Sequence, residues 1–117
     1  MVEMAETPST WQQGLQKRPH LAVNAGMLFN FHQSRMATMW MKDTLIALDM
    51  LFIDDHGVVV NVAENTKPLS LDIISAEAPV LAVLEVNAGT VAQLGIRPGD
   101  HVYHAIFAAA GAGAPTP

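Results

Sequence analysis

Three charged residues stand in stretches of the sequence that are otherwise apolar, and charges in such surroundings are candidates for chemistry. Asp49 and Glu85 each lie inside a run of large aliphatic and aromatic residues. Lys42 comes two residues after Trp40, so in a strand their side chains share one face. An unpaired carboxylate in apolar surroundings takes up a proton unless it finds hydrogen bonds or a cation. These residues are therefore either structural ties or parts of a site.

The functional interpretation is a pocket beneath Trp40 in which the charged residues converge. The stretch from Trp40 to Asp49 predicts two core strands joined at a bend, and the poorly patterned segment 63–79, which carries two prolines, is expected to form another wall. An apolar pocket with a few convergent polar groups is typical of a small-molecule or peptide site. The candidate binding residues are Trp40, Lys42, Asp43, Thr44, Asp49, Glu85 and Arg18.

Three functional hypotheses stay open on these residues. The first is a non-enzymatic binding or accessory module. The second is a small hydrolase or lyase with Asp49 or Glu85 as general base and Lys42 as electrostatic stabiliser, which requires an acid open to a cavity. In the third, a structural or interface domain, the two acids hydrogen-bond to loop amides and Lys42 extends to solvent. Backbone amides that seal Asp49 from solvent would exclude it as the base.

Other chemistries have little support. The chain has no cysteine, which excludes disulfides, thiolate metal sites and cysteine nucleophiles. His101 and His104 are three residues apart and would lie on opposite faces of a strand. Met36, Met39 and Met41 are more simply explained as core residues than as soft-metal ligands. We expect neither a metal nor a cofactor.

Composition limits the class of protein and its partners. The 117 residues are 50% hydrophobic and 15% charged, which predicts one globular domain over residues 1–107, followed by a flexible Ala, Gly, Pro and Thr tail over 108–117. A formal charge of −5 argues against a nucleic-acid partner. Charges interrupt every apolar run, so no membrane span is expected. The start of the chain lacks signal-peptide features, so the protein is either cytoplasmic or exported with its leader removed.

The pattern of residues predicts a mainly β fold, all-β or α+β. The expected form is a small antiparallel β-sandwich or barrel with two short helices and no parallel βαβ unit. Thr7 and Pro8 predict a helix start, and Asp54 to Gly57 predicts a hairpin turn, whereas residues 32–35 are expected to turn. The expected strands are 2–6, 26–31, 36–41, 48–53, 58–62, 80–86 and 101–107, and the expected helices are 9–15 and 91–94.

Several short blocks occur together in an order that resembles a known family. The blocks are Gly14-Leu15 with Arg18, Gly26-Met27-Leu28-Phe29, Trp40-Met41-Lys42-Asp43-Thr44, Leu48-Asp49, Val83-Leu84-Glu85-Val86 with Gly89, and Gly95-Ile96 with Gly99-Asp100. They resemble the bacterial and archaeal family known as domain of unknown function number one hundred ninety-two, over roughly residues 2–106. The resemblance implies a compact, mainly β single domain, often found behind a signal peptide or lipoprotein leader, with no established activity.

The sequence departs from the pattern of that family at four positions. Gln16 stands where methionine is typical, Met39 where an aromatic residue is typical, and Ala47 where proline is typical. Asp43 stands where asparagine is typical, and it adds a negative charge beside Lys42. If the family's site needs an amide at this place, the site in this chain is altered.

Overall fold

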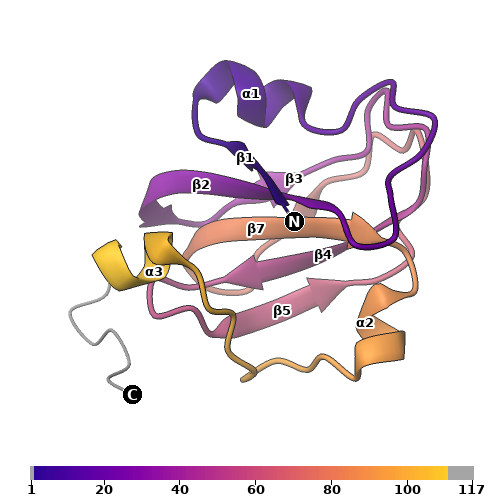
Figure 1. Ribbon diagram of the computed structural model, residues 1–117. Coiled ribbons are helices and arrows are strands. Elements are labelled where there is room, and N and C mark those ends of the chain that lie inside the picture. The colour runs from indigo at the N-terminus through magenta and orange to yellow at the C-terminus, as the bar shows by residue number, and fades with distance from the viewer. Residues whose placement is uncertain (1, 111–117) are drawn as a thin grey trace.

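A computed structural model describes residues 2–110 of the chain, and in this range the fold is mainly β with three short helices (Figure 1). None of these helices is long and apolar enough to cross a membrane. In chain order the elements are β1 (Val2–Ala5), α1 (Pro8–Gln13), β2 (Gly26–Arg35), β3 (Thr38–Met39), β4 (Leu48–Ile53), β5 (Val59–Ala63), β6 (Ile74–Ser75), β7 (Val80–Asn87), α2 (Thr90–Leu94) and α3 (Ala105–Ala110).

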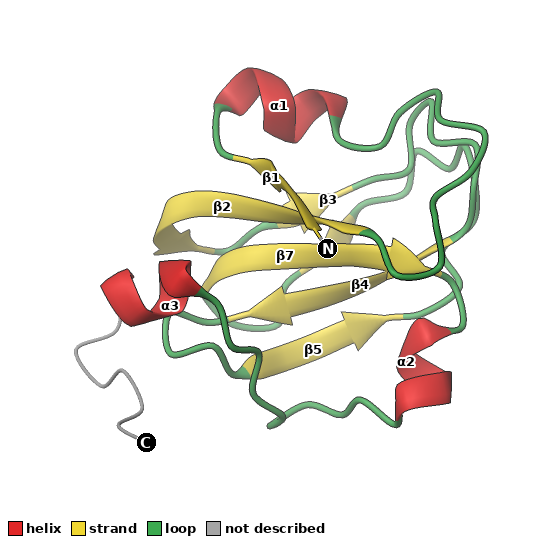
Figure 2. Cartoon of the chain, viewed as in Figure 1, coloured by secondary structure: helices red, strands yellow, loops and turns green. Residues whose placement is uncertain are grey.

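The strands form two sheets. Five of them pair in the order β1-β2-β7-β4-β5, and the short β3 and β6 pair with each other. Figure 2 shows the large sheet as an open one, with β1 and β5 at its two edges. The predicted mainly β, sandwich-like fold is therefore confirmed, and the sheet is not closed into a barrel.

Each face of the large sheet has its own apolar core, because neighbouring residues of a strand point to opposite faces. One face, which we call the Phe29 face, packs against α1, β3 and β6. The other, the Val91 face, packs against α2 and α3. The core residues that the sheet contributes to the Phe29 face are Ala5, Met27, Phe29, Phe31, Leu48, Met50, Phe52, Val80 and Val83. Those that it contributes to the Val91 face include Leu28, Leu51, Ile53, Val59 and Leu81.

Helix α1 is held over the Phe29 face by its start and by one tryptophan. Thr7 caps the helix, because its hydroxyl oxygen accepts a hydrogen bond from the Thr10 amide at 3.3 Å. The indole N–H of Trp11 donates to the carbonyl oxygens of Ala5 and Asn30, both at 3.0 Å. Since Ala5 ends β1 and Asn30 lies in β2, the tryptophan fastens the helix to both strands.

Two sequence-based expectations about topology are wrong. β1 and β2 are parallel and are connected through α1, although no parallel unit was expected. β2 also continues to Arg35, where the polar residues 32–35 predicted a turn. It does so through an irregularity after Asn30, at which His32 takes a φ of +67°. A bulge of this kind absorbs extra residues without ending a strand, so polarity alone does not locate the end of β2.

The C-terminal part of the domain also differs from expectation. The predicted strand over residues 101–107 is wrong: His101 makes an isolated bridge to Val58, and α3 begins at Ala105. The predicted hairpin turn is confirmed, since the Asp54 carboxylate accepts the amides of His56 and Val58, both at 2.9 Å. Residues 108–110 of the predicted tail complete α3, and residues 111–117 lie outside the part of the chain described.

Candidate functional site

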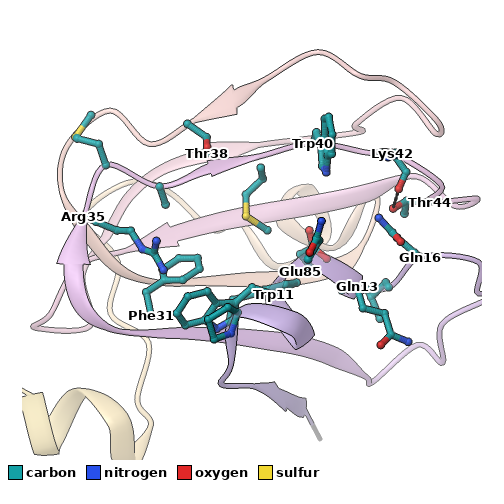
Figure 3. Close-up of a pocket in the computed structure, with 18 residues that line it drawn as sticks. Trp11, Gln13, Gln16, Phe31, Arg35, Thr38, Trp40, Lys42, Thr44 and Glu85 are labelled. Carbon is teal, nitrogen blue, oxygen red and sulfur yellow. Dashed lines mark hydrogen bonds between the residues drawn. The ribbon is translucent and has the colours of Figure 1, made fainter.

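A cavity of about 300 Å³ opens on the Phe29 face, between the sheet, α1 and the segment that runs from the end of β2 to Thr44 (Figure 3). Its walls are mostly aromatic and aliphatic side chains, with a few amide and charged groups among them. The residues that line it are Pro8, Trp11, Gln12, Gln13, Gly14, Leu15, Gln16, Phe29, Phe31, Arg35, Met36, Ala37, Thr38, Met39, Trp40, Lys42, Thr44 and Glu85.

Glu85 is the acidic residue of this lining. It comes from the central strand β7, where its neighbours across the sheet are Met27 of β2 and Met50 of β4. Only 4% of the residue is exposed, and its carboxyl group makes no hydrogen bond to another residue of the range 2–110. Since no fully enclosed side-chain oxygen in this range lacks a partner, the carboxyl oxygens are open to the cavity. Burial raises the pKa of Glu85 to about 8, because the charged form loses its hydration. At neutral pH the pocket therefore holds a carboxylic acid that can both donate and accept a hydrogen bond.

Arg35 lies at one end of the pocket between two aromatic rings. Its guanidinium carbon is 4.6 Å from the centroid of the Trp11 ring and 4.4 Å from that of Phe31. Cation–π contacts of this kind hold the guanidinium in place while its N–H groups stay available at the edge of the group. Within the described chain, no carboxylate lies in ion-pair range of Arg35.

Lys42 and Trp40 form the other end of the pocket. The Lys42 ammonium nitrogen is 5.3 Å from the centroid of the Trp40 ring, and Trp40 itself is 41% exposed. The turn that carries them is closed by the Thr44 hydroxyl, which donates to the Lys42 carbonyl oxygen at 3.2 Å. In Figure 3 Arg35 and Lys42 lie on opposite sides of Glu85.

The segment 63–79 supports the pocket without lining it. The Leu69 amide donates to the Thr44 carbonyl oxygen and the Met41 amide donates to the Ser70 carbonyl oxygen, both at 3.0 Å. The buried Thr66 hydroxyl is bonded to the Leu48 carbonyl oxygen at 2.9 Å. The expected wall of the pocket is therefore wrong, because this segment backs the Trp40–Thr44 turn, and α1 forms the wall instead.

Asp49 lies on the opposite face of the sheet from Glu85. It pairs with Val86 in β7, one residue away from the pair of Glu85 and Met50, so the two acids point in opposite directions. Asp49 is fully buried, and its two carboxylate oxygens accept three backbone amides. These amides belong to Asn65 at 2.9 Å, Gly89 at 3.0 Å and Val91 at 2.9 Å. These hydrogen bonds agree with the hypothesis that Asp49 has a structural role. They exclude Asp49 as a base in the pocket.

The remaining two candidates also lie outside the pocket. Arg18 pairs with Glu3, with a distance of 2.9 Å between Arg18 Nη2 and Glu3 Oε1. This hydrogen bond lowers the pKa of Glu3 and raises that of Arg18. Asp43 lines an adjacent, more open hollow that it shares with Trp40 and Lys42. Of the seven candidates, the structure therefore brings together Trp40, Lys42, Thr44 and Glu85.

The sequence reasoning missed Trp11, Phe31 and Arg35 as pocket residues. The signal for Phe31 was its place in the alternation of apolar residues that begins at Met27. Arg35 continues that alternation, but the expected turn at 32–35 removed it from the strand. No sequence pattern placed Trp11 over β2, since its hydrogen bond to Asn30 spans nineteen residues. Within residues 2–110 no three His, Asp or Glu side chains gather as a metal site would require.

Comparisons with known proteins give a family and similar solved structures. The family model DUF192, described as "Uncharacterized ACR", matches residues 1–104. A crystal structure from Sinorhizobium meliloti, of a protein provisionally described as a transcription regulator, is 48% identical, with a TM-score of 0.88 over 90% of this chain and 81% of that one. A protein of unknown function from Novosphingobium aromaticivorans is 41% identical, with a TM-score of 0.86 over 88% and 74% of the two chains. No curated protein matches the chain.

Replacing Asp49 with asparagine should destabilise the fold. The side-chain amide would offer a donor where the carboxylate accepts backbone N–H groups, so at least one buried amide would lose its partner. We expect the free energy of unfolding to fall by about 2–4 kcal/mol in urea denaturation. The exposed Asp72→Asn is the matched control, with an expected change below about 0.5 kcal/mol. Equal stability of Asp49→Asn and the native chain would contradict a stabilising role of these three hydrogen bonds.

Glu85→Gln should remove a pH dependence of stability. The folded state keeps the Glu85 proton up to a pKa of about 8, whereas the unfolded chain releases it near 4.5. The native chain should therefore lose stability between these two values, at up to about 1.4 kcal/mol per pH unit from this group. In urea denaturation from pH 5 to pH 9, the free energy of unfolding of the variant should increase relative to that of the native chain as pH rises. A stability difference that is constant with pH would contradict the burial of an unpaired carboxyl group.

Proposed function

The chain belongs to the DUF192 family of uncharacterised domains, and we propose that it is a binding module that takes up a small organic molecule or a peptide side chain in the pocket between Trp11 and Trp40. The observation that carries this proposal is Glu85. Its carboxyl group faces the pocket and makes no hydrogen bond to the described chain, which leaves its hydrogen-bonding capacity for a ligand.

The cost of such a group supports binding over a purely structural role. A carboxyl group that is almost fully buried loses most of its hydration, and Glu85 regains no hydrogen bond from the described chain in return. Asp49 shows how a structural acid is accommodated in this same sheet, since each of its oxygens accepts backbone amides. Glu85 has no such arrangement. A ligand that hydrogen-bonds to it offsets the cost when it binds.

The shape and walls of the pocket support the same function. Its volume of about 300 Å³ lies at the lower end of the range for small-molecule sites, and it combines aromatic walls with few polar groups. The backbone that supports the Trp40–Thr44 turn is strained, because Asp43 in that turn and Leu69 behind it both take positive φ values. Strain of this kind is frequent at ligand sites, where the surrounding structure maintains it.

A nucleic-acid ligand is not part of the proposal. The description as a transcription regulator belongs to the Sinorhizobium meliloti protein and is not transferred to this chain. This chain has a formal charge of −5, and binding to a phosphate backbone depends on clustered positive charge.

The binding function is tested by a thermal-shift screen of a fragment and metabolite library with matched lysine variants. Lys42 is exposed at the end of the pocket, so Lys42→Ala should leave the melting temperature within about 2 °C of the native value, consistent with an exposed substitution. Compounds that raise the melting temperature of the native chain should also do so for Lys67→Ala, an exposed control, but not for Lys42→Ala. If compounds stabilise all three proteins equally, the pocket is not where they bind.

A second candidate function rests on the same residue. A carboxyl group with a pKa of about 8 in a cavity can act as a general acid or base near neutral pH, with Lys42 stabilising negative charge. The screen separates the two functions when its stabilising compounds are re-examined for chemical change by mass spectrometry. Turnover that disappears in Glu85→Gln would favour the hydrolase or lyase, and unchanged compounds favour the binding module.

A further inference from the structure

We propose that the pocket selects organic carboxylates, namely ligands with an apolar or aromatic body whose carboxylate lies against Glu85 between the cations Arg35 and Lys42. This inference rests on the proposed function and adds the chemical class of the ligand. It is carried by the placement of the charged groups in the pocket and by the partners that those groups lack.

The sign of the charge in the pocket is opposite to that of the whole protein. The chain as a whole carries −5, whereas the charged residues of the lining are two cations and the one acid, Glu85. Neither Arg35 nor Lys42 has a carboxylate partner within the described residues; each lies instead over aromatic rings. Aromatic faces do not neutralise a cation, so both charges are available to an anion that enters the cavity.

The acid between the two cations is suited to an anion because it is neutral at physiological pH. The groups across the sheet from Glu85 are Met27 and Met50, and α1 contributes glutamines to the pocket but no charged residue. The titratable groups that face the cavity with Glu85 are thus Arg35 and Lys42. Burial raises the pKa of Glu85, because the charged form loses its hydration.

A protonated Glu85 can donate a hydrogen bond to a ligand carboxylate. Such a charge-assisted O–H···O⁻ bond is shorter and stronger than one between neutral groups. An ammonium ligand is disfavoured, because it would meet two positive charges and would find a negative charge at Glu85 only if that residue gave up its proton. The arrangement therefore discriminates between acids and amines by charge and by proton position together.

The aromatic residues determine what the rest of the ligand can be. Trp11 and Phe31 pack edge to face with centroids 5.2 Å apart at one end, and Trp40 lies at the other. The guanidinium carbon of Arg35 lies over both rings of the Trp11 and Phe31 pair, and the N–H groups of a guanidinium can bind the oxygens of a carboxylate. The cavity of about 300 Å³ between this pair and Trp40 has the apolar walls that an aryl or branched aliphatic body requires.

The test uses ligands that differ only in their polar end. Two-dimensional ¹H–¹⁵N NMR titrations of the full chain at pH 7 would compare 3-phenylpropionate with its amide, with 3-phenylpropylamine and with 2-phenylethyl phosphate, following the indole N–H signals of Trp11 and Trp40. We expect the carboxylate to bind at least tenfold more tightly than each of the others. The acetylated tripeptide alanyl-alanyl-phenylalanine with a free C-terminus, run alongside, separates a peptide C-terminus from a free acid as the source of the carboxylate.

Variants and pH then assign the contacts. Lys42→Gln and Arg35→Gln should each weaken 3-phenylpropionate binding about tenfold, whereas the exposed Arg97→Gln should not change it. Arg35→Lys, which keeps the charge but not the planar fork, should retain part of the affinity. In the native chain the affinity should fall as pH rises above 8, because ionised Glu85 repels the ligand. Glu85→Gln should keep binding, through its amide N–H, and should lose this pH dependence.

The outcomes separate the ligand class from the pocket itself. Tighter binding of the amine, the amide or the phosphate at the same tryptophan signals would overturn the carboxylate class while leaving the pocket as a binding site. An affinity for 3-phenylpropionate that stays constant from pH 7 to pH 10 in the native chain would also overturn the contact with Glu85. If no ligand of the set and no compound of the thermal-shift screen moves a pocket signal, the proposed binding function fails as well.

Discussion

The pairing of β7 with both β2 and β4 is the interaction on which the rest of the structure depends. Because side chains alternate along a strand, this central position places Glu85 on one face between Met27 and Met50. The next residue, Val86, pairs with Asp49, whose carboxylate points to the other face. A slip of one residue in this register would exchange the two environments. The register therefore decides which acid is structural and which one faces the pocket.

The two acids show opposite ways of burying a carboxyl group. The Asp49 carboxylate accepts hydrogen bonds from backbone amides of the 63–79 segment and of the start of α2. It therefore joins these two segments to the sheet. Glu85 has only apolar neighbours in the sheet and avoids the cost of a buried charge by holding its proton. The first arrangement stabilises the fold, whereas the second leaves a polar group that a ligand can use.

The pocket is assembled from parts that are distant in the sequence. Trp11 comes from α1, Arg35 from the end of β2 and Glu85 from β7, and the Trp40–Thr44 turn closes the opposite side. Each part is fixed by contacts outside the pocket, such as the indole hydrogen bonds of Trp11 and the link between Leu69 and Thr44. The cavity is thus preformed, which reduces the entropy cost of binding.

The sequence by itself determined the mainly β class, most strand positions, the Thr7 cap, the Asp54 turn and the unusual placement of Lys42, Asp49 and Glu85, because these follow from local periodicity and turn chemistry. It could not place Asp49 and Glu85 relative to each other, since strand order and register depend on pairing between distant segments. The sequence also predicted that β2 ends before Arg35, because polar residues at a β-bulge near His32 have the same composition as a turn. Only the tertiary structure decided that α1 covers the Phe29 face and that Arg35 and Lys42 lie on opposite sides of one buried acid, because long-range packing produces both arrangements.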